Sequence, residues 1–457
     1  MSPAPLVLRS RHTVTPRGIE DAVVVVRDGR IADVLPPEHA AARVAEDLGD
    51  LILMPGLVDT HVHVNEPGRT EWEGFETATR AAAVGGVTTI VDMPLNSVPA
   101  TTSAAALAEK RAAAEGKCTV DVAFWGGVVP GNAGEIEALA AAGVRGFKCF
   151  LVPSGVSEFP HVEERDVRDA MPAIARLGLP LLVHAELPGP IEAAARALAV
   201  AQPRTHAAWL ASRPRAAECE AIAMMLALCK ETGCPVHIVH LAAADAVPML
   251  RDARARGLPV TVETCPHYLT FAAEEIADGA TTFKCAPPIR ERGNRAALWT
   301  ALGEGVIDLV ATDHSPCPPA MKWLESGDFF AAWGGIASLE LALAATWTGA
   351  RERGFTPADL ARWMCARPTR LARLETTKGA IAPGLDADLV AWDPEAEWTV
   401  DPAALHQRHK VTPYAGRRLA GRVRRTYVRG EPVYRDGRLT GARPGRVLGA
   451  GSSAGAR

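Results

Sequence analysis

The feature that most constrains the fold of this sequence is a regular alternation of two kinds of segment between residues 57 and 313. Eight short segments rich in β-branched and aliphatic residues have the character of buried strands, and longer Ala-rich segments with helical periodicity lie between them. Eight such strand–helix units close naturally into a barrel with the strands inside, so we predict an α/β fold, a (β/α)8 TIM barrel. The expected strands are 57–63, 87–93, 120–126, 144–151, 179–184, 236–241, 260–264 and 307–313.

The segments between these strands predict helices. Thr70 and Glu73 have the spacing of a capping box, which predicts that the first helix begins directly after the first loop. The expected helices are 70–84, 103–114, 165–177, 215–232, 242–256 and 294–302.

Both ends of the chain have the character of β-hairpins. Near the start, strand-like runs at 23–26 and 31–35 flank Asp28-Gly29, and beyond residue 374 there are hairpin signals at Arg429-Gly430 and Asp436-Gly437. Because some fifty residues are too few for a stable β-domain, we expect residues 1–55 and 374–441 to form one small β-sandwich domain beside a barrel of residues 56–373. Further strands are expected at 379–381, 388–391, 398–400 and 426–434, and the Gly-, Ala-, Ser- and Arg-rich tail 442–457 is expected to be disordered.

Composition and charge argue against several classes of partner. The net charge of -4 and the lack of any basic run argue against nucleic acid. Nine scattered cysteines, an odd number without a C-x-x-C motif, indicate reduced thiols. The N-terminal region has no targeting segment, and its longest aliphatic run, 22–26, is too short to cross a bilayer. We therefore expect a cytoplasmic protein with no membrane partner.

Six residues with metal-binding or catalytic chemistry lie at or near the ends of the predicted strands. In barrels of this kind the catalytic groups lie at the C-terminal ends of the strands, so these side chains are expected to converge. Any one of them could be an ordinary buried group with a hydrogen-bond partner, but six at matching positions predict a shared site. They are His61 and His63 on the first strand, Lys148 on the fourth, His184 on the fifth, His240 on the sixth and Asp313 on the eighth.

This set of side chains predicts a dinuclear metal site. Imidazoles and a carboxylate suit zinc and its neighbours, whereas a lysine ammonium has no lone pair to donate. Lys148 fits if it has reacted with carbon dioxide to form N6-carboxylysine, a carbamate whose two oxygens bridge two metal ions. His61, His63 and Asp313 are then expected to hold one ion, and His184 and His240 the other.

The predicted site has a defined chemistry. Two cations acidify the water between them and polarise a carbonyl group, and Asp313 is placed to act as general base and to pass the proton to a leaving nitrogen. The predicted reaction is therefore hydrolysis of an amide-like C–N bond. Among the other histidines, His267 is a candidate to line the pocket, His237 is expected to face away from His240, and His314 is a candidate to orient Asp313.

These residues lie in stretches that resemble the amidohydrolase superfamily. The resemblance spans nearly all of residues 50–435, falls in the branch of dihydroorotases, hydantoinases and allantoinases, and is greatest to the allantoinases. H-x-H and the aspartate of the eighth strand mark only the superfamily, whereas Asn-Glu-Pro-Gly-Arg-Thr-Glu-Trp-Glu-Gly at 65–74 is typical of allantoinases. The other similar stretches are 92–96, 146–150, 264–268, 284–290, 312–319, 332–336 and 408–414.

The resemblance implies a specific activity and assembly. It implies opening of the hydantoin ring of allantoin to allantoate in purine catabolism, with two divalent ions, and a homo-oligomer, a tetramer. Dihydroorotases carry an arginine two residues after the second histidine, which suits the carboxylate of their substrate. This chain has Asn65 there, which fits a neutral ring with a ureido arm better. Asn65, Asn96 and Ser315 are the expected substrate contacts.

Two alternatives remain open from the sequence. One is a hydantoinase or dihydropyrimidinase, which would accept rings that lack the ureido arm. The other is a non-catalytic amidohydrolase-like scaffold that binds partners, although such proteins usually lose ligands and all six are present here. Two departures from the family pattern, Ala185 in His-Ala-Glu-Leu after the fifth strand and Ala286 before the double proline, bear only on substrate contacts.

Overall fold

The computed structural model describes residues 5–198 and 202–449, and it has a mixed α/β fold. Each of the eight predicted strand segments contains a strand, although most are shorter than the apolar run that predicted them. These strands are β6 (Leu57–Val62), β7 (Val87–Asp92), β8 (Asp121–Phe124) with β9 (Gly126–Gly127), β10 (Phe147–Phe150), β11 (Leu181–His184), β12 (Val236–Ile238), β13 (Val260–Thr264) and β14 (Leu309–Val310).

The strands are parallel and pair in chain order. Strands β6, β7 and β8 form one sheet, and β9 through β14 form a second. Only Trp125 separates β8 from β9, and a parallel bridge joins Val62 at the end of β6 to His314, which follows β14. The C-terminal ends of all eight strand segments therefore face the same way.

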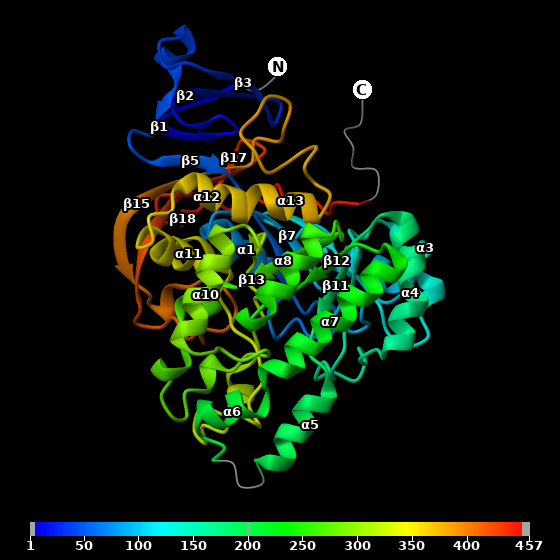
Figure 1. Ribbon diagram of the computed structural model, residues 1–457. Coiled ribbons are helices and arrows are strands. Elements are labelled where there is room, and N and C mark those ends of the chain that lie inside the picture. Colours follow the sequence, from blue (N-terminus) through cyan, green and yellow to red (C-terminus); the bar gives the residue numbers. More distant parts are fainter. Residues whose placement is uncertain (1–4, 199–201, 450–457) are drawn as a thin grey trace.

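Helices lie outside the strands (Figure 1). The prediction for the first helix was wrong at its start, because the helix begins at Phe75 with Gly74 as its N-cap. Glu73 is instead fully buried and accepts a hydrogen bond from the backbone N–H of Arg408, so no capping box forms. The helices are α1 (Phe75–Val84), α2 (Ala104–Ala114), α3 (Ile136–Ala142), α4 (Glu164–Leu177), α5 (Pro188–Ala197), α6 (His206–Ser212), α7 (Arg215–Thr232), α8 (Val247–Ala255), α9 (Pro266–Thr270), α10 (Arg292–Gly303), α11 (Ala342–Arg351), α12 (Pro357–Ala361) and α13 (Arg367–Leu371).

The two ends of the chain share one nine-stranded sheet, which extends from the top of Figure 1 down its left side. Strand β5 from the N-terminal region pairs antiparallel with β15, in a register that places Met54 opposite Val390. The expected hairpin turns occur, and Asp28, Arg429 and Asp436 each adopt positive φ before a glycine. The strands are β1 (Leu6–Thr15), β2 (Gly18–Arg27), β3 (Arg30–Leu35), β4 (Glu46–Asp47), β5 (Ile52–Pro55), β15 (Leu389–Thr399), β16 (Arg418–Val428), β17 (Glu431–Arg435) and β18 (Arg438–Leu439).

Two expectations near the C-terminus were wrong. Residues 379–381 form no strand, because Gly379 has a φ of 92° and packs so closely on Thr369 that a side chain would clash with it. Residues 442–449 are not disordered but run along β8, where the N–H of Leu448 donates to the carbonyl of Val122 at 2.8 Å. Arg446 also donates its N–H to Asp121. Residues 450–457, the rest of the expected disordered tail, lie outside the described residues.

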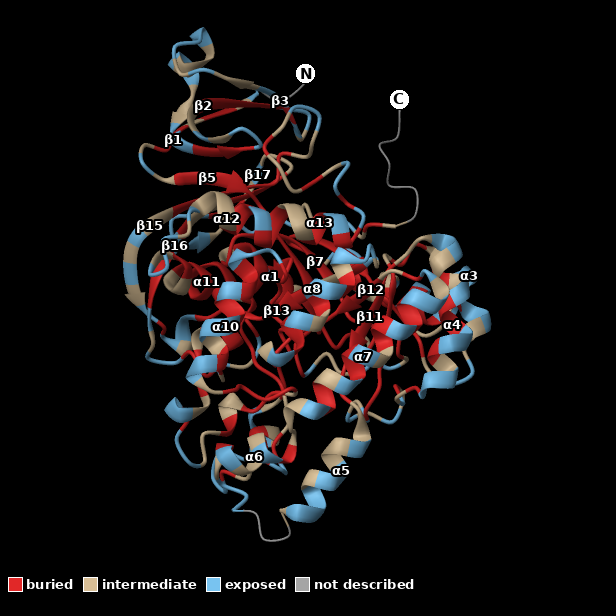
Figure 2. Ribbon diagram, viewed as in Figure 1, coloured by how far each residue is buried: buried red, intermediate tan, exposed pale blue. Residues whose placement is uncertain are grey.

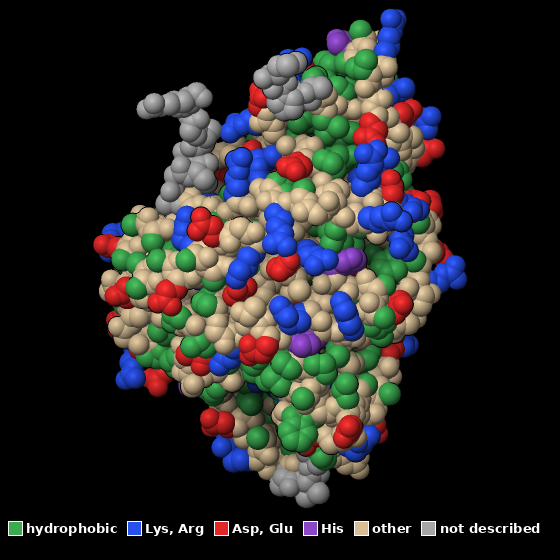
Figure 3. Space-filling view, turned by 180° about the vertical axis from the view of Figure 1, so that it is seen from behind, with side chains coloured by type: hydrophobic (Ala, Val, Ile, Leu, Met, Phe, Trp, Pro, Cys, Tyr) green, Lys and Arg blue, Asp and Glu red, His purple; other side chains and the backbone are tan. Residues whose placement is uncertain are grey.

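The buried residues concentrate between the strands and the helices and in the interior of the strands (Figure 2). One interior apolar cluster contains Val91, Trp125, Phe150, Leu182 and Val239, contributed by successive strand segments. On the face shown in Figure 3, basic and acidic side chains are interspersed, as the small net charge predicts. Across the part of the chain that the structure describes, every helix is too short or too polar to cross a bilayer.

Candidate metal centre

The four histidines and Asp313 that the sequence predicted to converge lie around one cavity. The rings of His61 and His63 have centroids 5.5 Å apart, those of His61 and His240 are 5.4 Å apart, and those of His184 and His240 are 4.7 Å apart. All are buried, with at most 7% of each residue exposed. The cavity has a volume of about 380 Å³.

Lys148 lies beneath these side chains. Strand β10 pairs with β11 so that Lys148 is opposite Leu182 and Phe150 is opposite His184. Because side chains alternate along a strand, Lys148 points to the same interior side as His184, one layer deeper. It is fully buried, and its Nζ has no hydrogen-bond partner among the described residues. Burial lowers the pKa of Lys148 to about 8, despite the attraction of Glu263 and Asp313.

His61, His63 and Asp313 form one half of the site, which we call the Asp313 half. The Oδ1 atom of Asp313 lies 3.2 Å from the Nε2 atom of His61 and 3.4 Å from that of His63. Nitrogen and carboxylate atoms of this trio lie within 4.8 Å of one another, which is close enough to hold a single metal ion. Burial alone would raise the pKa of Asp313, but the two imidazoles hold it well below its usual range.

His184, His240 and Lys148 form the other half, the Lys148 half. Burial lowers the pKa of His184, and burial together with the neighbouring His184 and Lys148 lowers that of His240 well below its ordinary value. Both rings are therefore neutral at neutral pH, which is the form that binds metal ions. The ring of His184 stacks on Phe150 with centroids 4.5 Å apart.

Glu263 supports both halves and was missed by the sequence reasoning. It accepts a hydrogen bond from Nδ1 of His61, one from His237 at 3.0 Å and one from the backbone N–H of His240 at 3.2 Å. Together with Asp313 it raises the pKa of His61 to about 9, against the effect of burial. A single carboxylate in the buried strand Val-Thr-Val-Glu-Thr was the signal available in the sequence, because such a charge needs a partner.

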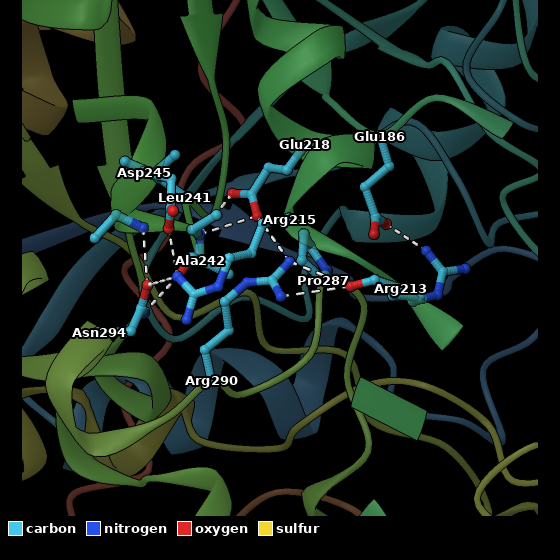
Figure 4. A network of polar contacts seen from close by, with 12 residues as sticks. Glu186, Arg213, Arg215, Glu218, Leu241, Ala242, Asp245, Pro287, Arg290 and Asn294 are labelled. Carbon is cyan, nitrogen blue, oxygen red and sulfur yellow. Dashed lines mark hydrogen bonds and ion pairs between the residues drawn. The ribbon is translucent and has the colours of Figure 1, made fainter. Parts of the chain in front are cut away.

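Glu186 has the matching role beside His184. Its Oε2 atom lies 2.8 Å from Nε2 of His184 and also forms an ion pair with Arg213, which Figure 4 shows on the right. The two residues are two apart in His184-Ala185-Glu186, and that spacing was the available signal. Carboxylates that hold the second nitrogen of a ligating histidine fix its orientation and raise its basicity.

The loop after β12 is held by the network in Figure 4. His240 has a φ of 38°, a left-handed conformation that costs about 1–3 kcal/mol and must be stabilised by its surroundings. Glu218 accepts hydrogen bonds from the N–H groups of Ala242 and Ala243 at 2.7 and 2.9 Å, and Asn294 donates to the carbonyl of Ala242. These contacts fix the backbone just beyond His240.

The predicted substrate contacts divide into two kinds. Asn96 and Ser315 line the cavity, and the hydroxyl of Ser315 donates to Oδ1 of Asp313 at 2.8 Å. Asn65 is fully buried and lies behind Asn96, whose side-chain amide donates to Asn65 at 3.0 Å. Asn65 therefore lies outside the cavity lining and reaches the cavity through Asn96.

Of the other candidate histidines, His237 and His314 have hydrogen-bond partners, whereas neither ring nitrogen of His267 has one among the described residues. The ring nitrogens of His237 form hydrogen bonds with the side chains of Thr261 and Glu263. His314 accepts hydrogen bonds from the N–H groups of Ser338 and Leu339, so it anchors that segment. His267 is fully buried and is not among the residues that line the cavity.

The donor set fits metal ions. In addition to Lys148 Nζ, the Nδ1 atoms of His63 and His240 are buried and have no hydrogen-bond partner among the described residues. Buried polar atoms are rarely left unpaired, so unpartnered nitrogens on three residues of one site fit a donor set for metal ions.

The amidohydrolase family model matches residues 52–433. The chain belongs to the amidohydrolase family. This confirms the prediction that it is a hydrolase, and the family together with the His and Asp cluster implies a divalent metal site.

Similar proteins cover nearly the whole amidohydrolase chain. An allantoinase from Streptomyces avermitilis is 52% identical over 451 residues, which cover 98% of this chain and 99% of that protein. An allantoinase from Arabidopsis thaliana is 43% identical, covering 94% of this chain and 88% of that protein. Among solved structures, an L-hydantoinase from Arthrobacter aurescens has a TM-score of 0.91 at 32% identity, covering 98% of this chain and 100% of that one.

Proposed function

We propose that this amidohydrolase is an allantoinase, which opens the hydantoin ring of allantoin with water to give allantoate. The observation that carries the substrate assignment is the 52% identity to the Streptomyces avermitilis allantoinase along almost the entire length of both chains. The site supports the reaction class, because a buried histidine and carboxylate cluster that lines a cavity is suited to metal-assisted hydrolysis of an amide.

We propose that the site holds two zinc ions. His61, His63 and Asp313 would bind one ion, His184 and His240 the other, and Lys148 as N6-carboxylysine would bridge them. The support is the neutral, buried state of His184 and His240 and the unpartnered amine of Lys148. When bound, such ions lower the pKa of a water molecule and polarise the substrate carbonyl.

Asp313 is the proposed general base. His61, His63 and Ser315 all contact its Oδ1 atom, which leaves Oδ2 without a hydrogen bond among the described residues. Because the pKa of Asp313 lies well below its usual range, the carboxylate is unprotonated and can accept a proton from the attacking water. It would then pass that proton to the ring nitrogen that leaves as the C–N bond breaks.

We also propose that the eight strands close into a (β/α)8 barrel, with the shared sheet of both chain ends as its β-sandwich domain. The bridge between Val62 and His314 and the single residue between β8 and β9 support closure. A homo-tetramer is the proposed assembly, which size-exclusion chromatography with light scattering would test.

A second candidate function is that of a hydantoinase or dihydropyrimidinase. Similarity to solved structures favours this candidate. A dihydropyrimidinase from Brevibacillus agri superposes on 97% of this chain with a TM-score of 0.88, at 27% sequence identity. Such an enzyme would accept rings that lack the ureido arm.

Ring opening of allantoin, hydantoin, dihydrouracil and dihydroorotate by the purified, metal-loaded protein tests the assignment. We expect the highest kcat/KM for allantoin. A preference for dihydrouracil or hydantoin would contradict allantoinase activity and leave the proposed hydrolytic chemistry intact.

A further inference from the structure

A short segment without regular secondary structure, Phe330–Gly335, forms part of the cavity lining, and we call it the wall segment. Residues 331 through 335 all line the cavity that also contains the histidine cluster. The backbone of such a segment cannot pair within a helix or a sheet, so its buried polar groups need other partners.

Two buried lysines supply these partners. The ammonium group of Lys284 donates to the carbonyl of Phe330 at 3.0 Å and to that of Ala332, and Lys284 is only 6% exposed. Lys322 is 4% exposed and donates to the carbonyl of Trp333 at 3.0 Å and to that of Gly335. Four of the carbonyls in the wall segment therefore accept hydrogen bonds from two side chains.

Two buried ammonium groups at this place are costly. Burial, together with the charge of Lys322, lowers the pKa of Lys284 to about 7, and burial lowers the pKa of Lys322 as well. Packing alone would be served better by apolar side chains, because a lysine gains nothing in an apolar contact that offsets desolvation of its charge. The Nζ atom of Lys284 also lies 4.4 Å from the ring centroid of Trp209, another residue of the cavity lining.

The position of the wall segment matters for the site. A Cβ atom on Gly335 would lie 2.4 Å from the carbonyl oxygen of Ser315, so the backbone at Gly335 is packed directly against the residue that contacts Asp313. At Gly334, neither the N–H nor the carbonyl has a hydrogen-bond partner among the described residues, and this residue lines the cavity. The wall segment thus offers unpaired backbone groups to whatever occupies the cavity.

We propose that Lys284 and Lys322 are positioning residues for substrate binding, which hold the wall segment at the distance from the histidine cluster that the substrate ring requires. This inference rests on the proposed function for the identity of the ring. Ile336, the residue that follows the wall segment, is tied to the Asp313 side separately, because its carbonyl accepts a hydrogen bond from the N–H of Ser315. Loss of one lysine should therefore affect substrate binding more than the chemical step.

The test uses the metal-loaded full-length protein with Lys284→Met and Lys322→Met. We expect KM for allantoin to rise about tenfold in each variant, because the lost contacts stabilise the bound substrate and the transition state equally. The value of kcat should stay within about threefold of wild type, and the metal content should not change. Peptide-resolved hydrogen exchange should show faster exchange of amides in residues 320–336. Lys284→Gln keeps two N–H donors, so its KM should lie closer to the wild-type value than the KM of Lys284→Met.

Lys410→Met is the control for loss of a lysine that donates to backbone carbonyls away from the cavity. Lys410 donates to the carbonyls of Leu405 and Gln407, does not line the cavity and, unlike Lys284 and Lys322, is exposed. It should leave KM and exchange of residues 320–336 unchanged. Unchanged KM and unchanged exchange in soluble Lys284→Met or Lys322→Met would overturn the inference, as would a loss of metal with a normal KM. If the protein hydrolyses a ring other than allantoin, KM is measured with that ring, and the exchange result needs no substrate.

Discussion

The Asp313 half and the Lys148 half of the site are built from similar imidazoles but differ in charge. In the Asp313 half, Asp313 and Glu263 attract positive charge and raise the pKa of His61 to about 9. In the Lys148 half, Glu186 acts on His184 and Glu263 and Asp313 act on Lys148 in the same direction, but burial outweighs them and lowers the pKa of both His184 and Lys148. Glu186 is nearby, but its charge is shared with Arg213.

This difference would account for a modified residue in one half only, as proposed for Lys148. The Asp313 half already carries the negative charge that a divalent cation needs, whereas the Lys148 half has two neutral imidazoles and an amine. Carboxylation of Lys148 would convert its one positive group into a negative one. The proposed carbamate is thus the counterpart of Asp313.

The largest expected effect comes from removing that counterpart. Lys148→Ala should lose both metal ions and lower kcat/KM by about ten-thousandfold, because neither ion keeps its bridge. Elemental analysis and steady-state kinetics measure the two losses. Lys148→Arg is the matched control for charge, since arginine stays cationic and forms no carbamate. Wild-type activity in Lys148→Arg would contradict the proposed modification.

Removing the carboxylate of the other half should separate metal binding from catalysis. Asp313→Asn is expected to keep much of its metal and to lose about a hundred- to a thousandfold in kcat, because the amide cannot accept the proton from water. Metal content and kcat are measured on the same preparation. Hydrolysis at a near-normal rate would show that Asp313 is not the general base.

The carboxylates behind the histidines should have intermediate effects. Glu263→Gln and Glu186→Gln are each expected to weaken metal binding by about 10- to 100-fold. Glu263→Gln should have the larger effect, because Glu263 contacts His61, His237 and the backbone of His240. Metal release to a competing chelator measures both. Equal release from the two variants and wild type would mean that these contacts do not tune the ligands.

The smallest expected effect is on substrate binding alone. Asn96→Ala should raise KM about tenfold, which corresponds to one or two hydrogen bonds, and should leave the metal content unchanged. Steady-state kinetics with allantoin provides the measurement. A loss of metal in this variant would mean that the Asn96–Asn65 pair serves the metal site and not the substrate.

Much of this arrangement could be predicted from local sequence. Five of the eight strand segments carry a predicted site residue at or near the C-terminal end, and the order of the strands followed from their apolar runs. Five of the six predicted residues line one cavity, and the sixth, Lys148, lies beneath them. The hairpins at Arg429-Gly430 and Asp436-Gly437 followed from turn chemistry.

What could not be predicted depends on contacts between distant segments. Glu263 joins His61 across about two hundred positions of sequence, and no local pattern links the two residues. The local sequence predicts a strand that begins at Gly379, and only the close contact of Gly379 with Thr369 in the fold shows why none forms. Residues 442–449 have the composition of a disordered tail, yet backbone groups of β8 at Val122 exchange hydrogen bonds with Arg446 and Leu448. Lys284 and Lys322, which donate to the wall segment, could not be linked to it from the sequence, although Lys284 begins the family-like stretch 284–290.

The central claim is that the Lys148 half acquires its negative charge by carboxylation. The most direct measurement is the ¹³C NMR spectrum of the metal-loaded protein prepared in ¹³C-labelled bicarbonate, recorded beside that of Lys148→Arg. The account predicts a single carbamate resonance in the wild-type protein that is missing in the variant. An active wild-type protein with two metal ions per chain and no carbamate resonance would contradict it.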